Sequence, residues 1–286
     1  MRDYTSISPS AKSLLLMKGL TDIPFVAEAA KLVWGNEAVK NLPNLLEKEN
    51  FIKRLIHFEA RYKSVDMVLE LLGNKNIIEL SSGYSFRGLH MALHNPDIFY
   101  ADTDLPEVID IKSDLTLQFI EQERLELQGE LLTLPLNALD ENEFRKIAGL
   151  LPSGPLNIIN EGLLMYLNTI EKEKLCQIIH PILKERGGYW ITADIYVRKD
   201  TKLTSGNDMF NRFLEAHNVE ENKFESFEQA EQFFYKQGFR IHHKAGPVWH
   251  QLSTLKYMEQ DHLTQPVQQA GKLGKMRATW ALVPFK

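Results

Sequence analysis

Cysteine is nearly absent from this chain, and its scarcity excludes one way of stabilising a fold. The 286 residues include a single cysteine, so no intrachain disulfide can form. That residue, Cys176, falls in the helical segment IEKEKLCQIIHPILKE, where we expect a small core side chain rather than a nucleophile. A chain without disulfides is typical of a reducing compartment, and we therefore expect the protein to be cytoplasmic.

Long apolar runs and a strong charge of one sign are also missing. No uninterrupted apolar stretch approaches the roughly twenty residues that cross a bilayer, and the opening MRDYTSISPS has no apolar signal-peptide region. The formal net charge is −5, and no basic stripe is interleaved with aromatic residues. We therefore expect neither a membrane span nor a nucleic-acid partner. The spacing of His242, His243 and His250 matches no metal-ligand pattern, so we predict no metal site.

The hydrophobic content of 44% is enough for a sizeable core in a single α/β domain over residues 1–286. Residues 1–74 read as a helical cap, with helices expected at 12–20, 24–34, 36–47 and 51–72. In the last of these helices apolar residues recur at steps of three and four, which predicts one buried stripe. The stripe consists of Phe51, Leu55, Phe58, Tyr62, Val65, Leu69 and Leu72.

After the cap, strands and helices alternate, which predicts a doubly wound sheet with parallel pairing over residues 75–286. The expected strands are 75–80, 98–103, 131–133, 156–160, 189–195, 239–243 and 277–283. The expected helices are 86–93, 107–122, 141–150, 169–185, 208–216 and 227–237. A helical insert is expected at about 246–275, with its helix near 253–262.

The segment after residue 75 predicts a nucleotide pocket. A short apolar run ends at Leu80 and is followed by Ser81, Ser82 and Gly83, small residues that let backbone N–H groups and a helix N-terminus approach a ligand. The next apolar run ends in Asp104, about twenty residues downstream, where dinucleotide-binding folds place a carboxylate on the ribose hydroxyls.

Asp104 also has a purely structural interpretation. It precedes Leu105-Pro106-Glu107, which could begin a helix with proline in its first turn, so Asp104 could be an N-cap. Ser81 departs from the full G-x-G-x-x-G fingerprint as well. Local pattern alone leaves the cap and the ribose contact both open.

Three segments, ELSSGYSFRGL, YADTDLPEVIDIK and NEGLLMYL, resemble in this order and spacing the leucine carboxyl methyltransferase family. The likeness is greatest to its bacterial O-methyltransferases of polyketide biosynthesis, and it covers nearly the whole chain, including the opening ISPSAKSLLLMKGL. It implies a class I methyltransferase that uses S-adenosylmethionine. It also implies a Rossmann-like seven-stranded sheet whose last strand is antiparallel.

The resemblance also implies roles for individual residues. Lys12 and Arg61 match the basic residues that hold the carboxylate of the cofactor's methionine half, although Arg61 would be read from spacing alone as a solvated charge. Ser81 and Gly83 match the turn under the methionine, and Asp104 matches the acid on the ribose.

Fewer residues match at the adenine and at the acceptor. Where the family often has an acid facing the adenine, this chain has Pro135 followed by Leu136, with Asn137 and Asp140 as alternatives. Glu161 matches the acid after the fourth strand. We take Glu161 and Tyr166 as the candidate catalytic residues, and we expect Glu161 and Leu136 to contact the cofactor as well. We expect Arg87 to be structural. We further expect Trp249, Tyr257 and Met258 either to line the acceptor pocket or to pack the insert onto the body.

The expected acceptor is a carboxylate of a small molecule, which is already ionised near neutral pH and needs no strong base. A hydroxyl acceptor would instead need a base such as Glu161 or a histidine. An inactive methyltransferase fold that only binds a ligand or partner is a further alternative, against which the joint presence of the matched residues argues. A Rossmann dehydrogenase would need a fuller glycine fingerprint.

Overall fold

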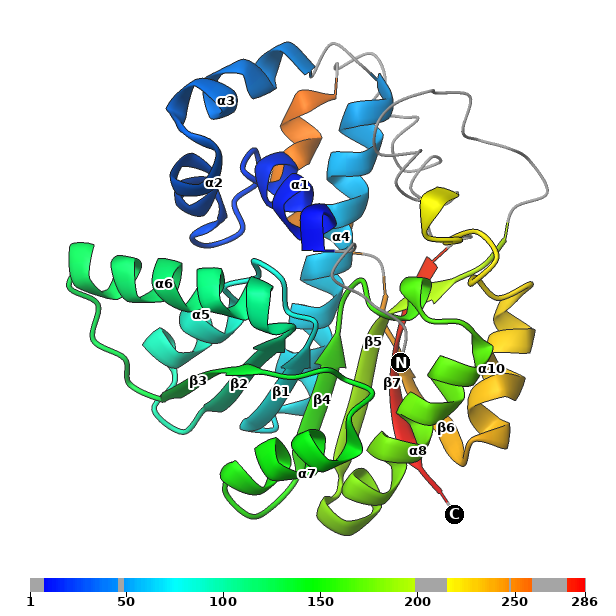
Figure 1. The fold of residues 1–286 in the computed structure, drawn as a ribbon. Coiled ribbons are helices and arrows are strands. Elements are labelled where there is room, and N and C mark those ends of the chain that lie inside the picture. The colour runs from blue at the N-terminus through cyan, green and yellow to red at the C-terminus, as the bar shows by residue number, and fades with distance from the viewer. Residues whose placement is uncertain (1–7, 46–48, 199–214, 247, 259–276, 286) are drawn as a thin grey trace.

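The computed structural model describes residues 8–45, 49–198, 215–246, 248–258 and 277–285. A seven-stranded sheet with the order β3-β2-β1-β4-β5-β7-β6 forms its centre (Figure 1). Its strands are β1 (Asn76–Leu80), β2 (Phe99–Asp104), β3 (Glu130–Pro135), β4 (Leu156–Asn160), β5 (Gly188–Tyr196), β6 (Phe239–Lys244) and β7 (Arg277–Pro284). Strands β1 to β5 pair in parallel, whereas β7 is antiparallel to both β5 and β6. The predicted seven-stranded α/β sheet with an antiparallel last strand is confirmed.

Helices cover both faces of the sheet. One face carries α4 (Glu49–Leu72), α5 (Arg87–His94) and α6 (Pro106–Gln122); the other carries α7 (Glu141–Leu150), α8 (Thr169–Arg186) and α10 (Phe227–Lys236) (Figure 1). Strand side chains alternate between the two layers, with Ile77 packed toward α4 and Ile78 toward α8. In the described part of the chain, no helix combines the length and hydropathy needed to cross a membrane.

The start of α5 lies unusually close to β2, and glycine makes this approach possible. A Cβ atom at Gly88 would lie 2.6 Å from Cδ1 of Tyr100, well inside contact distance. Any larger residue at position 88 would push α5 off the sheet. Because α5 follows the turn after β1, this packing fixes where that turn lies.

The cap lies over the carboxyl-end edge of the parallel strands (Figure 1). It consists of α1 (Ser8–Lys18), α2 (Val26–Trp34), α3 (Asn36–Asn41), a short 3₁₀ helix η2 (Leu42–Leu45) and the first turns of α4. The predicted stripe on α4 is buried from Leu55 to Leu69, and its two ends, Phe51 and Leu72, are half-buried. The cap therefore covers the edge of the sheet at which ligands of such folds bind.

A buried carboxylate of the cap holds the start of a short helix in the insert. Glu59 on α4 is 0% exposed and accepts hydrogen bonds from the backbone N–H groups of Ser253 (2.8 Å) and Thr254 (3.0 Å) and from both hydroxyls. These residues begin the 3₁₀ helix η5 (Ser253–Tyr257), which follows η4 (Trp249–Gln251). The rest of the helix expected at 253–262, and most of the one expected at 208–216, lie outside the described residues.

Candidate active site

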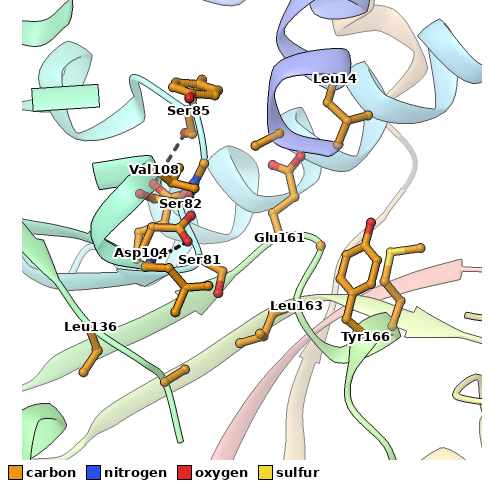
Figure 2. Close-up of a pocket in the computed structure, with 18 of the residues that line it drawn as sticks. Leu14, Ser81, Ser82, Ser85, Asp104, Val108, Leu136, Glu161, Leu163 and Tyr166 are labelled. Atoms are coloured by element: carbon orange, nitrogen blue, oxygen red, sulfur yellow. Dashed lines mark hydrogen bonds between the residues drawn. The ribbon is translucent and has the colours of Figure 1, made fainter. Parts of the chain in front are cut away.

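A cavity opens at the carboxyl ends of the strands, beneath α1 (Figure 2). Its walls are the turn 81–85 after β1, the end of β2, the loop 136–139 after β3 and the loop 161–167 after β4, with α1 and α4 above. Figure 2 shows Asp104 beside Ser81 and Ser82, and Tyr166 on the other side of Glu161. Among the described residues, no group of three or more His, Cys, Asp or Glu side chains could hold a metal ion. The lining residues combine charged side chains such as Lys18, Arg61 and Glu161 with small and apolar side chains.

The turn after β1 is fixed by Asp104 at the end of β2. The Gly83 N–H donates to one oxygen of Asp104 and the Leu105 N–H to the other, both at 2.7 Å. Ser81 and Gly83 both have positive φ, 51° and 53°, and a serine held there is strained, as residues at functional sites often are. The helix α6 is capped at Leu105 without a side-chain hydrogen bond, so the N-cap interpretation of Asp104 is not what the structure shows.

Burial raises the pKa of Asp104, and the hydrogen bonds from Gly83 and Leu105 act in the opposite direction. Each carboxylate oxygen accepts one of the two bonds, which leaves further acceptor capacity on both. Asp104 also lines the cavity. The side chain can therefore hold the turn and still accept hydrogen bonds from a ligand.

Glu161, directly after β4, lies among three cations. Its carboxylate is 2.8 Å from Lys18 Nζ, 3.1 Å from Arg61 Nε and 3.2 Å from Arg87 Nη2. Burial alone would raise the pKa of Glu161, but these three positive charges hold it well below its ordinary value. Glu161 is therefore ionised at neutral pH and is suited to binding a cation rather than removing a proton.

Arg87 joins the carboxylates of the site. It is 2% exposed, stacks over the Tyr62 ring at 4.0 Å, and pairs with Asp66 (2.6 Å) and Glu79 besides Glu161. Glu79 lines the cavity and is a residue that the sequence analysis missed. The sequence did hold a signal for Glu79, because it lies in the apolar strand NIIEL, which is fully buried. A glutamate in such a strand is almost never buried unless it is paired, so it pointed to a buried cation.

The loop that carries Glu161 is held by Asp194 of β5. The Asp194 carboxylate accepts hydrogen bonds from the N–H groups of Gly162 and Leu163 at 2.7 Å, from that of Leu164 at 3.1 Å, and from the Asn160 amide at 2.7 Å. This buried carboxylate satisfies the start of the 3₁₀ helix η3 (Leu164–Tyr166). The sequence analysis did not identify Asp194, which has no local signature in TADIY.

Lys12 and Lys18 lie on the same helix but in different surroundings. Lys12 is half-buried and is not among the cavity-lining residues, whereas Lys18 lines the cavity, pairs with Glu161 and lies 5.4 Å from the centre of the Tyr62 ring. Arg61, predicted with Lys12, is 2% exposed, so it is not the solvated charge that spacing alone suggested. Of these two lysines of α1, the one that pairs with Glu161, beside Arg61, is thus Lys18.

The wall beyond Asp104 is mainly apolar. Val108, Leu136 and Leu139 line it together with Asn137. Asp140, an alternative polar contact in the sequence analysis, instead caps α7 by accepting from the Glu143 N–H at 3.1 Å, and it does not line the cavity. A flat, mainly apolar ring would fit this wall, and the side-chain amide of Asn137 lies at the wall to form hydrogen bonds with polar atoms of such a ring.

At the opposite end, Tyr166 lines the cavity with Leu14, Phe58 and Met165. Tyr166 is 7% exposed. The insert residues Trp249 and Met258 are not among the lining residues and pack against the apolar cluster of α4. Of the two roles considered for them, the described structure has the packing one.

The strand order, the antiparallel β7, the small-residue turn after β1 and the acid ending β2 define an α/β fold of the class I methyltransferase type.

No protein-family model and no curated protein matches the chain. Among solved structures it is similar to an O-methyltransferase of neocarzinostatin biosynthesis, NcsB1, solved with S-adenosylmethionine and 2-hydroxy-5-methyl naphthoic acid, at 8% identity and a TM-score of 0.50, covering 97% of this chain and 70% of that one. It is also similar to the mitomycin 7-O-methyltransferase MmcR at 10% identity and a TM-score of 0.48, covering 85% of this chain and 60% of that one. The chain therefore spans less than two thirds of the mitomycin enzyme. At these identities the likeness shows the fold alone, and the leucine carboxyl methyltransferase family is not shown.

Proposed function

We propose that the protein is an S-adenosylmethionine-dependent O-methyltransferase that converts a carboxylate of a small molecule to a methyl ester. The observation that carries this proposal is the group formed by Lys18, Arg61 and Glu161, next to Gly83 and Asp104. The group offers positive and negative charges within one cavity, and Asp104, the acid proposed to bind the ribose, lines the same cavity.

The charges fit the methionine half of the cofactor, which carries one carboxylate and one ammonium group. Lys18 and Arg61 would hold the carboxylate, and Glu161 would hold the ammonium group. Each ion pair now made inside the protein would then be exchanged for one to the ligand, so no buried charge is left unpaired. In this proposal Lys18 takes the role that the resemblance implied for Lys12.

The remaining parts of the cofactor fit the other walls. Asp104 retains acceptor capacity for the ribose hydroxyls, and the strained turn at Ser81 and Gly83 lines the same cavity, where it would lie under the methionine half. The apolar wall around Leu136, edged by Asn137, would hold the adenine.

When bound, S-adenosylmethionine would supply a methyl group on a positive sulfur, which an acceptor oxygen attacks while the carbon–sulfur bond breaks and its electron pair returns to sulfur. Leu14, Phe58 and Leu163 would exclude the water that otherwise solvates an anionic acceptor. Tyr166 would line the acceptor side. A carboxylate acceptor needs no base, which agrees with the low pKa of Glu161. Alignment and desolvation would therefore supply the rate enhancement.

Several finer statements belong to the same proposal. We propose a distant relation to the leucine carboxyl methyltransferase family, a role in polyketide-type natural-product biosynthesis, and a single methyltransferase domain. We also propose that the protein works in the cytoplasm. Cys176 supports the cytoplasmic location. It is a free, buried thiol whose pKa is raised by burial, and a protein with a free thiol and no disulfide is typical of a reducing compartment.

The acceptor class can be tested by the alkali lability of the product. We expect methyl label from S-adenosylmethionine, transferred to an acid found in a screen of small carboxylic acids, to be released as methanol on brief treatment with mild base. Methyl esters hydrolyse under these conditions, whereas methyl ethers and methylamines survive, and a stable methyl ether serves as the control. Label that stays on the acceptor would contradict the carboxylate assignment and favour a hydroxyl acceptor.

Asp104→Asn tests the ribose contact. An amide has one acceptor oxygen, so its NH₂ group would face one of the two N–H donors, and we expect the free energy of unfolding to fall by about 1 to 3 kcal/mol. We expect the affinity for S-adenosylhomocysteine to fall by about tenfold or more in the same variant. Titration calorimetry and chemical denaturation measure the two effects. Asp140→Asn, outside the cavity, is the matched control, and an unchanged affinity in Asp104→Asn would remove Asp104 from the binding site.

A further inference from the structure

A buried ion pair lies behind the turn that follows β1. Lys112 on α6 is 0% exposed and Asp102 on β2 is 1% exposed, and Lys112 Nζ lies 2.7 Å from the Asp102 carboxylate. The same Nζ donates a hydrogen bond to Ser82 Oγ at 2.9 Å. Ser82 lines the cavity (Figure 2), whereas Lys112 and Asp102 do not. The ion pair therefore contacts the cavity wall from outside, through Ser82.

This ion pair is costly to bury. Burial raises the pKa of Asp102, and the charge of Lys112 acts in the opposite direction. Taking two charges out of water is so unfavourable that replacing a buried ion pair with apolar side chains of similar size is often neutral or stabilising. Buried ionic groups can instead hold one particular arrangement of the chain. In this protein the arrangement in contact with the pair is the turn 81–85.

The turn has to be held because its backbone is strained. Ser81 has a φ of 51°, a conformation that a residue with a side chain keeps only where its surroundings determine it. Part of the hold comes from β2. The Ser82 N–H donates to the Thr103 carbonyl at 2.9 Å, and the Gly83 N–H donates to Asp104 at 2.7 Å.

The contact from Lys112 differs from the contact to Asp104 in what it shares with the ligand. In the proposed function, Asp104 also accepts hydrogen bonds from the ribose, so the turn and the ligand use the same carboxylate. Lys112 lies outside the cavity, and its hydrogen bond to Ser82 is charge-assisted. It therefore holds the turn through a contact for which the ligand does not compete.

We propose that Lys112, held by Asp102, is a positioning residue for the cofactor, because its hydrogen bond to Ser82 keeps the turn 81–85 in the geometry that binds S-adenosylmethionine. This inference rests on the proposed function and adds a residue that prepares the cofactor site from outside it. A turn that already has its bound geometry loses less conformational entropy when the ligand binds, and the affinity is higher for that reason.

A pair of neutralising substitutions tests this role without leaving a buried charge unpaired. Asp102→Asn/Lys112→Met removes both charges and the donor to Ser82. We expect its Kd for S-adenosylhomocysteine, measured by titration calorimetry, to rise about tenfold. Circular dichroism shows whether the variant is folded. Glu143→Gln/Lys146→Met, which removes an exposed ion pair of α7 in the same way, is the matched control and leaves the Kd unchanged.

A double-mutant cycle shows whether Lys112 acts through Ser82. Ser82→Ala keeps both charges and removes only the acceptor of the hydrogen bond, so we expect a similar rise in Kd. Adding Asp102→Asn/Lys112→Met to Ser82→Ala should then raise the Kd by less than about twofold more, because the contact is already lost. Losses that multiply to about a hundredfold would show independent effects and would overturn the positioning role.

Hydrogen exchange of the ligand-free protein reports on the turn itself. In Asp102→Asn/Lys112→Met we expect the Gly83 amide to exchange about tenfold faster than in the wild-type protein, because a turn that is held less firmly opens more often. Exchange in β4 should stay unchanged. Loss of general stability would instead speed exchange in both segments together.

The outcomes separate this inference from the proposed function. If the wild-type protein binds S-adenosylhomocysteine and folded Asp102→Asn/Lys112→Met binds it equally well, the positioning role is overturned and the methyltransferase proposal stays intact. A wild-type Kd in Ser82→Ala would overturn the role too, whether or not the other variant folds. A wild-type protein that does not bind S-adenosylhomocysteine would contradict the proposed function, and the positioning role would fail with it.

Discussion

Arg61→Ala is expected to bind S-adenosylhomocysteine about 10- to 100-fold more weakly than the wild-type protein. Arg61 is 2% exposed and pairs with Glu161, so its contact to a ligand carboxylate would be charge-assisted and desolvated. Such a contact contributes about 1.5 to 3 kcal/mol. Titration calorimetry with S-adenosylhomocysteine measures the loss without any turnover.

Two lysine variants sharpen this prediction. Lys18→Ala should weaken binding as well, whereas Lys12→Ala should leave the Kd unchanged because Lys12 does not line the cavity. Circular dichroism confirms that each variant is folded. A wild-type affinity in folded Arg61→Ala would exclude Arg61 from the site, and weaker binding in Lys12→Ala but not in Lys18→Ala would restore the role implied by the resemblance.

Arg87→Met is expected to lower the free energy of unfolding by about 3 to 5 kcal/mol at neutral pH. The change leaves Glu79, Asp66 and Glu161 without their shared cation, and Glu79 is 1% exposed. Breaking a buried ion pair on one side is costly because the remaining charge stays buried. Urea denaturation of the two proteins measures the difference.

The pH dependence of that difference checks its electrostatic origin. The pKa of Glu161 is depressed in the folded protein, so its contribution is present above the ordinary carboxyl pKa of about 4.3 and is lost as the pH falls toward the folded value. Arg87 supplies part of this depression, so the deficit of Arg87→Met should shrink as the pH is lowered. Glu79→Gln should also rescue part of the deficit in the double variant. If Arg87→Met loses the same free energy of unfolding at neutral and at acidic pH, and Glu79→Gln restores none of it, the loss would come from a packing defect instead.

The elements of the sheet could be predicted from the sequence because their signals are local. The strand at 131–133 was placed correctly but was too short, since β3 spans Glu130–Pro135 and pairs along its whole length with β2. That extension depends on a neighbouring strand rather than on local propensity. The helix expected at 36–47 ends at Asn41 and continues as 3₁₀, because proline at 43 cannot donate within an α-helix.

The site residues also differ in whether their signal is local in the sequence. Gly83 and Asp104 could be predicted because turn, strand and acid fall within one short unit. Their mutual hydrogen bond bridges 21 residues. The resemblance implied a role for Lys12 on α1, whereas the lysine of α1 that lines the cavity and pairs with Glu161 is Lys18. The ion pair between Lys18 and Glu161 spans 143 residues and leaves no periodic trace in the sequence. Glu79 and Asp194 were missed for a related reason, since their roles follow from partners that only the folded chain brings together.

Titration calorimetry of the wild-type protein with S-adenosylhomocysteine, and with NAD as the comparison, tests the central claim most directly. The account predicts saturable one-site binding of S-adenosylhomocysteine and no binding of NAD at the same concentrations, because the charges at Lys18, Arg61 and Glu161 fit an amino-acid end that NAD does not have. Absence of binding by S-adenosylhomocysteine, or tighter binding of NAD, would contradict it.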